Sequence, residues 1–174
     1  MGKRLPKDIQ VLFDKLYKNK EIPSIKRGSR QMRLGYPVLF VYDPKYKKIL
    51  PYYDTLPLSI ILNKYSDGFL GINLHYIPWA RRIQLAKQLV RRTKNKNRIT
   101  YIDIKKAFKS AKLPLALANF ALRRYLYSHV RSDMKFFDWE TYDLAVKDIR
   151  PKFKKRSEQA ILKATLEKFK NSKK

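Results

Sequence analysis

The stretch GYPVLFVYDPKYKKILPYYDTLPLSIILNKYSDGFLGINL, residues 35–74, decides the fold class of this chain. Its first hydrophobic run, Val38–Tyr42, is rich in β-branched and aromatic side chains, which favour strands. Asp43 and Pro44 then supply a turn, which predicts a hairpin with the run that ends at Asp54. Four short strands are expected in all, at 38–42, 49–54, 58–65 and 69–74. We therefore predict a small antiparallel four-stranded sheet or a partly open barrel over about residues 37–74.

Outside this block, hydrophobic residues recur with the helical period. Thr100 and Asp103 have the spacing of a capping box, which marks the start of one helix. The segment 115–127 is apolar almost all round, so it is expected to form a central buried helix. Helices are expected over 7–18, from 78, from 100, over 115–127, from an N-cap at Asp138 to Pro151, and over 157–170. The fold class is therefore α+β, with five or so amphipathic helices packed on the sheet.

The length and composition predict one domain. A chain of 174 residues with 44% hydrophobic content can bury a core of its own. We expect a single domain over residues 1–174, divided into an N-terminal helix with a basic arm (1–35), a β core (36–78), a helical half (79–150) and a basic C-terminal helix (151–174).

The charge of the chain is far from balanced. It contains 41 Lys and Arg against 14 Asp and Glu, a formal net charge of +27. Such an excess repels itself in a compact fold, which indicates a polyanionic partner, most simply the phosphate backbone of a nucleic acid. The segment 81–112 is the most basic part, with twelve Lys and Arg and a single acidic residue, Asp103. No apolar run approaches the roughly 20 residues of a membrane span, so no membrane contact is expected.

The positions of these cations predict where a nucleic acid would lie. They recur on helix faces and in loops, an arrangement that can form a continuous stripe along a phosphate backbone. Tyrosines 46, 52, 53 and 65 are able to stack on exposed bases, or to pack on each other as tyrosines of a small sheet more often do. The expected nucleic-acid-binding residues are Arg81, Arg82, Lys87, Arg91, Arg92, Lys94, Lys96, Arg98, Lys105, Lys106, Lys109, Arg27, Arg30 and Arg33.

The sequence does not predict catalysis. It has no cysteine, two histidines and no glycine-rich phosphate loop. Asp43, Asp54 and Asp67 lie at predicted strand ends, where aspartate more often caps a turn than binds a metal. His75 stands among apolar neighbours and is more often structural than catalytic in such a place. We therefore expect no enzyme activity, no catalytic residue, no metal site and no cofactor.

The segment 35–78 resembles a block in the DNA end protector proteins of contractile-tailed phages. The matching residues are Leu50–Asp54, Pro57, Gly68–Leu74, His75, Tyr76 and Pro78. The resemblance covers about 45 residues, and the flanks match only in being basic and helical. It implies a minor virion component that binds the ends of the packaged genome near the portal and shields them from host exonucleases.

The leading prediction is therefore a non-enzymatic virion protein that binds double-stranded DNA by phosphate contacts. It would reside in the virion, and in the host cytoplasm during assembly. One alternative is a structural neck, tail or baseplate protein whose basic helices dock other virion subunits, such as the portal. A further alternative is an RNA-binding or ribosome-associated protein, and the weakest is a nuclease that uses Asp43, Asp54 or His75.

Overall fold

The structure is a computed structural model that describes residues 5–16, 24–25, 32–93, 96, 100–137 and 141–171. The helices are α1 (Lys7–Leu16), α2 (Trp79–Thr93), α3 (Tyr101–Ser110), α4 (Ala116–Ala121), α5 (Tyr142–Asp148) and α6 (Glu158–Asn171). The strands are β1 (Ser24–Ile25), β2 (Pro37–Leu39), β3 (Tyr53–Asp54), β4 (Leu58–Lys64), β5 (Gly68–Asn73), β6 (Leu122–Leu126), β7 (Met134–Phe136) and β8 (Phe153–Lys154). Two short 3-10 helices follow β5 and β6, at Leu74–Tyr76 and Tyr127–His129.

The strands form a six-stranded sheet in the order β1-β7-β2-β4-β5-β6 and a separate pair, β3-β8. All the pairings are antiparallel. The α+β class is confirmed, but the expected count of four strands in the sheet is wrong. The strand order has two ends, β1 and β6, so the described sheet is open and is not a barrel.

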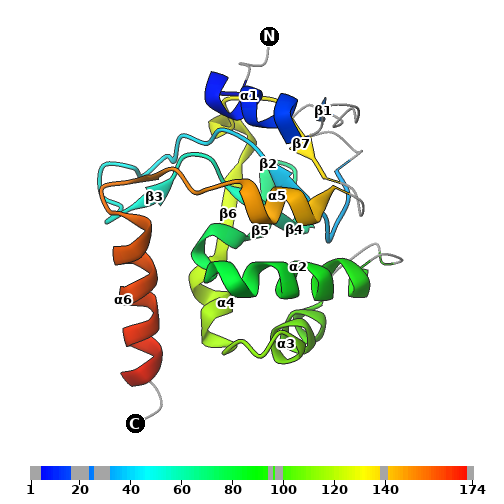
Figure 1. The fold of residues 1–174 in the computed structure, drawn as a ribbon, viewed down its shortest axis with the longest axis vertical. Helices are drawn as coiled ribbons and strands as arrows, with labels where there is room; N and C mark the ends of the chain where they lie inside the picture. Colours follow the sequence, from blue (N-terminus) through cyan, green and yellow to red (C-terminus); the bar gives the residue numbers. More distant parts are fainter. Residues whose placement is uncertain are drawn as a thin grey trace.

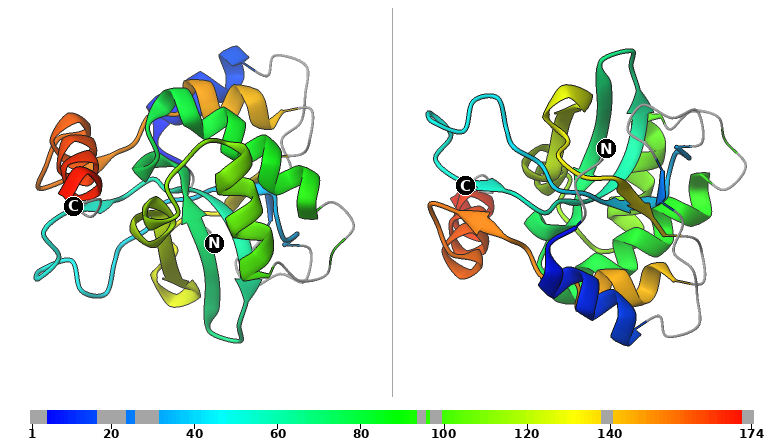
Figure 2. Two further views of the ribbon diagram at one scale, coloured as in Figure 1. Left: turned by 90° about the horizontal axis from the view of Figure 1, so that it is seen from below. Right: turned by 90° about the horizontal axis from the view of Figure 1, so that it is seen from above.

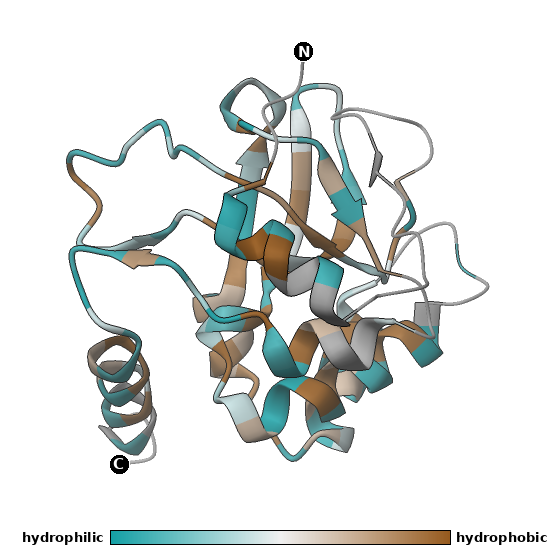
Figure 3. Cartoon of the chain, turned by 45° about the horizontal axis from the view of Figure 1, so that its top comes forward, coloured by the Kyte–Doolittle hydropathy of each residue, from teal (hydrophilic) through white to brown (hydrophobic). Residues whose placement is uncertain are grey.

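The two faces of the sheet bury different side chains, because successive residues of a strand point to opposite sides. On one face, Leu58, Ile60 and Leu62 of β4 pack in a core with residues from all six helices. On the other face, Phe40, Phe69 and Tyr125 belong to a second, aromatic-rich core. Figure 2 shows the helices gathered on one side of the strands, and Figure 3 shows that the strands are mostly hydrophobic whereas the loop before β3 is mostly hydrophilic. The sheet therefore has a helix-covered face and a face covered chiefly by loops.

The predicted hairpin between 38–42 and 49–54 is wrong. β2 pairs with β4 and β7, whereas β3 pairs with β8 near the other end of the chain. Pro44 and Pro51 lie in the intervening segment, and proline cannot donate the backbone hydrogen bond that a regular hairpin needs. This segment is instead the long loop that extends from the body of the molecule before β3 (Figure 1). The strands expected at 58–65 and 69–74 are confirmed as β4 and β5.

The predicted buried helix over 115–127 is also wrong in its second half. α4 ends at Ala121, and the next five residues form β6 on the edge of the sheet beside β5. Gly68 permits this pairing, since a Cβ there would lie 1.9 Å from the carbonyl oxygen of Tyr125. Pairing with β5 therefore overrides the local helix propensity of the segment.

The other predicted helices are present, with small shifts of their ends. α3 begins with the expected capping box, in which Thr100 and Asp103 each bond the backbone of the other. α6 docks through the buried side chains of Ile161 and Thr165, and its far end extends away from the body (Figure 1). The expected N-cap at 138 and most of the basic arm lie outside the described residues.

Candidate nucleic-acid interface

Six exposed cations lie on α2 and α3. The two helices pack side by side, and the Arg92 guanidinium donates to the Ser110 hydroxyl across them at 3.1 Å. Neither helix carries an acidic residue on its exposed side. We define the α2–α3 surface by its exposed cations, which are Arg81, Lys87, Arg91, Lys105, Lys106 and Lys109.

The acidic residue of this region, Asp103, is buried and satisfied. Its carboxylate accepts from the backbone and hydroxyl of Thr100 and from the Lys96 ammonium at 2.5 Å. Burial acts to raise the pKa of Asp103, but these hydrogen bonds outweigh it and hold the pKa at about 2. Asp103 therefore pairs with Lys96, which is not one of the cations of the α2–α3 surface.

The prediction that Arg82 binds nucleic acid is wrong, because its side chain is fully buried. Its guanidinium donates to the carbonyl oxygens of Ile77 (2.7 Å) and His75 (3.1 Å) and to the carboxylate of Glu158 (2.8 Å). Burial lowers the pKa of Arg82, and the bond to Glu158 opposes that shift. Arg82 therefore joins α2 to α6 and is not accessible to a phosphate.

The remaining predicted cations occupy varied places. Arg92 is half-buried against α3, Lys96 is engaged by Asp103, and Arg33 is exposed before β2. Whether these positions contact nucleic acid stays a prediction. Four others, Lys94, Arg98, Arg27 and Arg30, lie outside the described residues.

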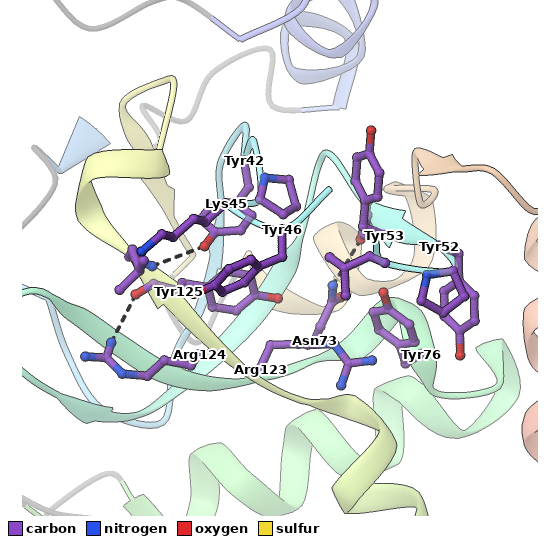
Figure 4. Close-up of a pocket in the computed structure, with 15 residues that line it drawn as sticks. Tyr42, Lys45, Tyr46, Tyr52, Tyr53, Asn73, Tyr76, Arg123, Arg124 and Tyr125 are labelled. Atoms are coloured by element: carbon purple, nitrogen blue, oxygen red, sulfur yellow. Dashed lines mark hydrogen bonds between the residues drawn. The ribbon is translucent and has the colours of Figure 1, made fainter. Parts of the chain in front are cut away.

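A cavity of about 440 Å³ lies between the loop before β3 and the strands β5 and β6. Its floor includes Tyr125 of β6, and its roof is the loop before β3, as the close-up shows (Figure 4). Three basic side chains, Lys45, Arg123 and Arg124, line it as well. Six tyrosines contribute to the lining, which are Tyr42, Tyr46, Tyr52, Tyr53, Tyr76 and Tyr125. We call this site the tyrosine–arginine cavity.

Cations lie over several of these rings. The Arg123 guanidinium carbon is 4.3 Å from the centre of the Tyr76 ring, and the Lys45 ammonium is 5.4 Å from that of Tyr46. Arg124 differs, because it pairs with Asp67 as well as lying 4.2 Å from the ring of Tyr65. Arg123 forms no ion pair with a carboxylate in the part of the chain that the structure describes.

The buried tyrosines of the cavity retain their phenolic protons at neutral pH. Burial raises the pKa of Tyr76 to about 12, although Arg123 acts against the shift. Burial likewise raises the pKa of Tyr125, against a smaller opposing effect of the nearby Asn73 side chain, and the geometry of the described residues gives its hydroxyl no hydrogen bond. The neighbouring Asn73 side chain is engaged elsewhere, since it donates to Asp54 (3.1 Å) and accepts from the backbone of His75 (3.0 Å).

Asp54 and His75 form a buried structural pair. The Asp54 carboxylate lies 2.6 Å from Nδ1 of His75 and also accepts from Asn73, Leu56 and the backbone of Lys152. Burial acts to raise the pKa of Asp54, but the charge and hydrogen bond of His75 outweigh it, so the pKa is lowered. Nε2 of His75 faces the carbonyl oxygen of Ile149 at 3.2 Å, so both ring nitrogens have partners.

The three aspartates at predicted strand ends do not meet. Asp43 pairs with Lys47 and Arg131, Asp67 pairs with Arg124, and Asp54 is buried with His75. Within the described ranges, no three acidic, histidine or cysteine side chains are grouped to hold a metal ion. Asp54 also accepts from the backbone two residues on, which confirms its expected role in a turn.

Lys45, Arg123 and Arg124 are not among the site residues predicted from the sequence. The two arginines were placed on a buried helix, and Lys45 in a hairpin turn. The available signal was the run LRRYLY (122–127), in which basic and aromatic residues adjoin, as they do in strands that bind single-stranded nucleic acid.

The fold and its surfaces define a basic α+β protein with exposed cations on two packed helices and a separate tyrosine-rich cavity. The chain matches the family described as the phage T4 terminal DNA protecting protein over residues 17–165, and it belongs to that family. Neither the curated proteins nor the solved structures contain a match. In the described part of the chain, no helix is both long and apolar enough to cross a membrane.

Proposed function

We propose that this protein shields the ends of phage DNA by binding the duplex through phosphate contacts on the α2–α3 surface. The family supports the role in DNA end protection. The observation that carries the choice of surface is the row of six exposed cations on two packed helices, with Asp103 already neutralised by Lys96. Lysine and arginine side chains on such a surface bind phosphates without reading sequence, as protection of any end requires.

The same proposal places the protein in the virion near the portal, where the ends of the packaged genome lie, and in the host cytoplasm during assembly. It requires no catalysis, because a bound protein blocks an exonuclease sterically. Asp54 and His75 are the residues that most resemble a catalytic pair. Both ring nitrogens of His75 already have partners within the fold, which supports a structural role for the pair.

Salt dependence tests the phosphate contacts. If the six cations of the α2–α3 surface each neutralise one phosphate, the affinity for duplex DNA should fall about a thousandfold between 50 and 200 mM salt. The variant in which Lys105, Lys106 and Lys109 are changed to Gln should lower the slope of log K against log salt by about 2.7, at 0.9 per contact. Fluorescence anisotropy with a labelled closed circular duplex measures both quantities.

A matched control separates local contacts from net charge. Lys7, Lys163 and Lys170 are exposed on α1 and α6. Changing these three to Gln removes the same charge but should leave the slope nearly unchanged. Equal slopes for the two triple variants would mean that the α2–α3 surface is not where the phosphates bind.

A further inference from the structure

We propose that the tyrosine–arginine cavity is a second nucleic-acid site, which receives the unpaired terminal nucleotide of a DNA strand. The base would stack on Tyr46, the exposed tyrosine at the rim, and the phosphate would meet Arg123 and Lys45. This inference rests on the proposed function, because it assigns the recognition of an end to a different part of the molecule from the surface that binds the duplex.

The size and lining of the cavity suit one nucleotide. Its volume of about 440 Å³ lies in the range of about 300–1,000 Å³ that small-molecule sites occupy. Aromatic rings bind a base by stacking whatever its identity, which suits ends of any sequence. Tyr46 is 59% exposed at the rim, so its ring is available to an incoming base.

The charges that line the cavity favour an anion. The carboxylate in the wall, Asp54, is satisfied by His75, Asn73 and backbone donors. Asp67 outside the cavity is engaged by Arg124. Arg123 and Lys45 therefore line the cavity without a carboxylate partner among the described residues. A phosphate group of a ligand would supply the anionic partner that they lack.

An unsatisfied polar group also points to a ligand. The side chain of Tyr125 is 3% exposed, and its hydroxyl borders the cavity without a hydrogen-bond partner in the described structure. Because burial keeps that hydroxyl protonated, it is able to donate to an acceptor on a base or a phosphate. Buried polar groups are rarely left unpaired unless a ligand or water completes them.

A cavity of this kind distinguishes an end from the interior of DNA. Bases within a duplex are stacked and paired, and extracting one costs least where it is already unpaired. Among the described residues, those that line the cavity come from neither α2 nor α3, and the close-up shows them on the loop before β3 and on the strands (Figure 4). A strand end and a duplex should therefore bind the protein independently.

The test uses single-stranded oligothymidylate, which forms no duplex, as a linear strand and as a closed circle of the same length. The linear strand should bind about tenfold more tightly than the circle, and a closed circular duplex should not displace it. Tyr46→Ala should abolish that preference, because the loss of one stacking ring costs about 5- to 100-fold in affinity. Arg123→Gln should abolish it as well, because this change removes the positive charge that meets the phosphate. Tyr101→Ala, which removes a comparably exposed tyrosine from α3, should leave the preference intact.

Three results would each overturn the inference. The linear and circular oligothymidylates could bind with equal affinity, the preference for the linear strand could survive both cavity variants, or the closed circular duplex could displace the linear strand. Weakened affinity of those variants for a virion protein, with no effect on DNA, would overturn it in favour of a protein ligand. Failure here is distinct from failure of the proposed function, because binding of the closed circular duplex and its salt slope are measured without any free end.

Discussion

Single residues in this protein hold distant segments together. Asp54 in β3 accepts from the backbone of Lys152, and His75 reaches the carbonyl of Ile149 after α5. Arg82 joins α2 to Glu158 at the start of α6. Nearly all the polar atoms of these buried groups form hydrogen bonds. Because the partners are residues 149, 152 and 158, the bonds fix the position of the C-terminal segment.

Removal of His75 should be costly. In His75→Ala, Asp54 would remain buried without its principal partner, and breaking a buried pair from one side costs about 3–5 kcal/mol. His129→Ala is the matched control, since His129 is more exposed and bonds one carbonyl oxygen, that of Asp43. Urea denaturation gives the free energies of unfolding. A smaller loss for His75→Ala than for His129→Ala would show that the buried pair does not stabilise the fold.

At this scale, the sequence predicts the role of a residue well where that residue acts on its neighbours in the chain. The turn at Asp54 was predicted from adjacent residues and is confirmed. The structural role expected of His75 stays a prediction, which the hydrogen bonds of both its ring nitrogens support. The burial of Arg82 was not predicted, because its helical position fits an exposed face equally well. Its environment depends on Glu158, which lies 76 residues further along the chain.

Elements were predicted best where their ends carry local signals. α3 has a capping box, and β4 and β5 are joined by a short turn. β6 was missed because nothing in its own residues excludes a helix. Its conformation is set by the edge of β5, with Gly68 admitting the backbone of Tyr125. Strand pairing of this kind depends on tertiary contacts, which the intrinsic secondary-structure propensity of the residues does not reflect.

The capping box of α3 predicts a pH effect. Asp103→Asn should lower the free energy of unfolding by about 1 kcal/mol near neutral pH, as the loss of a helix cap does. Because the folded-state pKa of Asp103 is lowered to about 2, its contribution is present above about pH 4 and is lost as the pH falls through 2. The difference between wild type and variant should therefore shrink from pH 5 to pH 2 in urea denaturation. A difference that stays constant over that range would contradict this assignment.

The two candidate sites of the whole molecule are built from different elements. The α2–α3 surface consists of helical cations, whereas the tyrosine–arginine cavity is lined by the loop before β3 and by residues of β5, β6 and the 3-10 helix between β5 and α2. The distribution of charge along the sequence predicted the cations of the α2–α3 surface, because two consecutive helices supply them. The cavity was not predictable, since its walls come from the loop before β3, the end of β5 and β6, which lie far apart in sequence. We propose that these parts fold as one domain, held at its C-terminal side by Arg82 and Asp54.

Exonuclease protection tests the central claim most directly. A linear duplex is incubated with a processive exonuclease and saturating protein at about 100 mM salt, and intact DNA is measured over time. Wild-type protein and the Lys7, Lys163 and Lys170 variant should preserve the duplex, whereas the Lys105, Lys106 and Lys109 variant should not. Degradation at the rate of free DNA with wild-type protein, or full protection by the α2–α3 variant, would contradict the account.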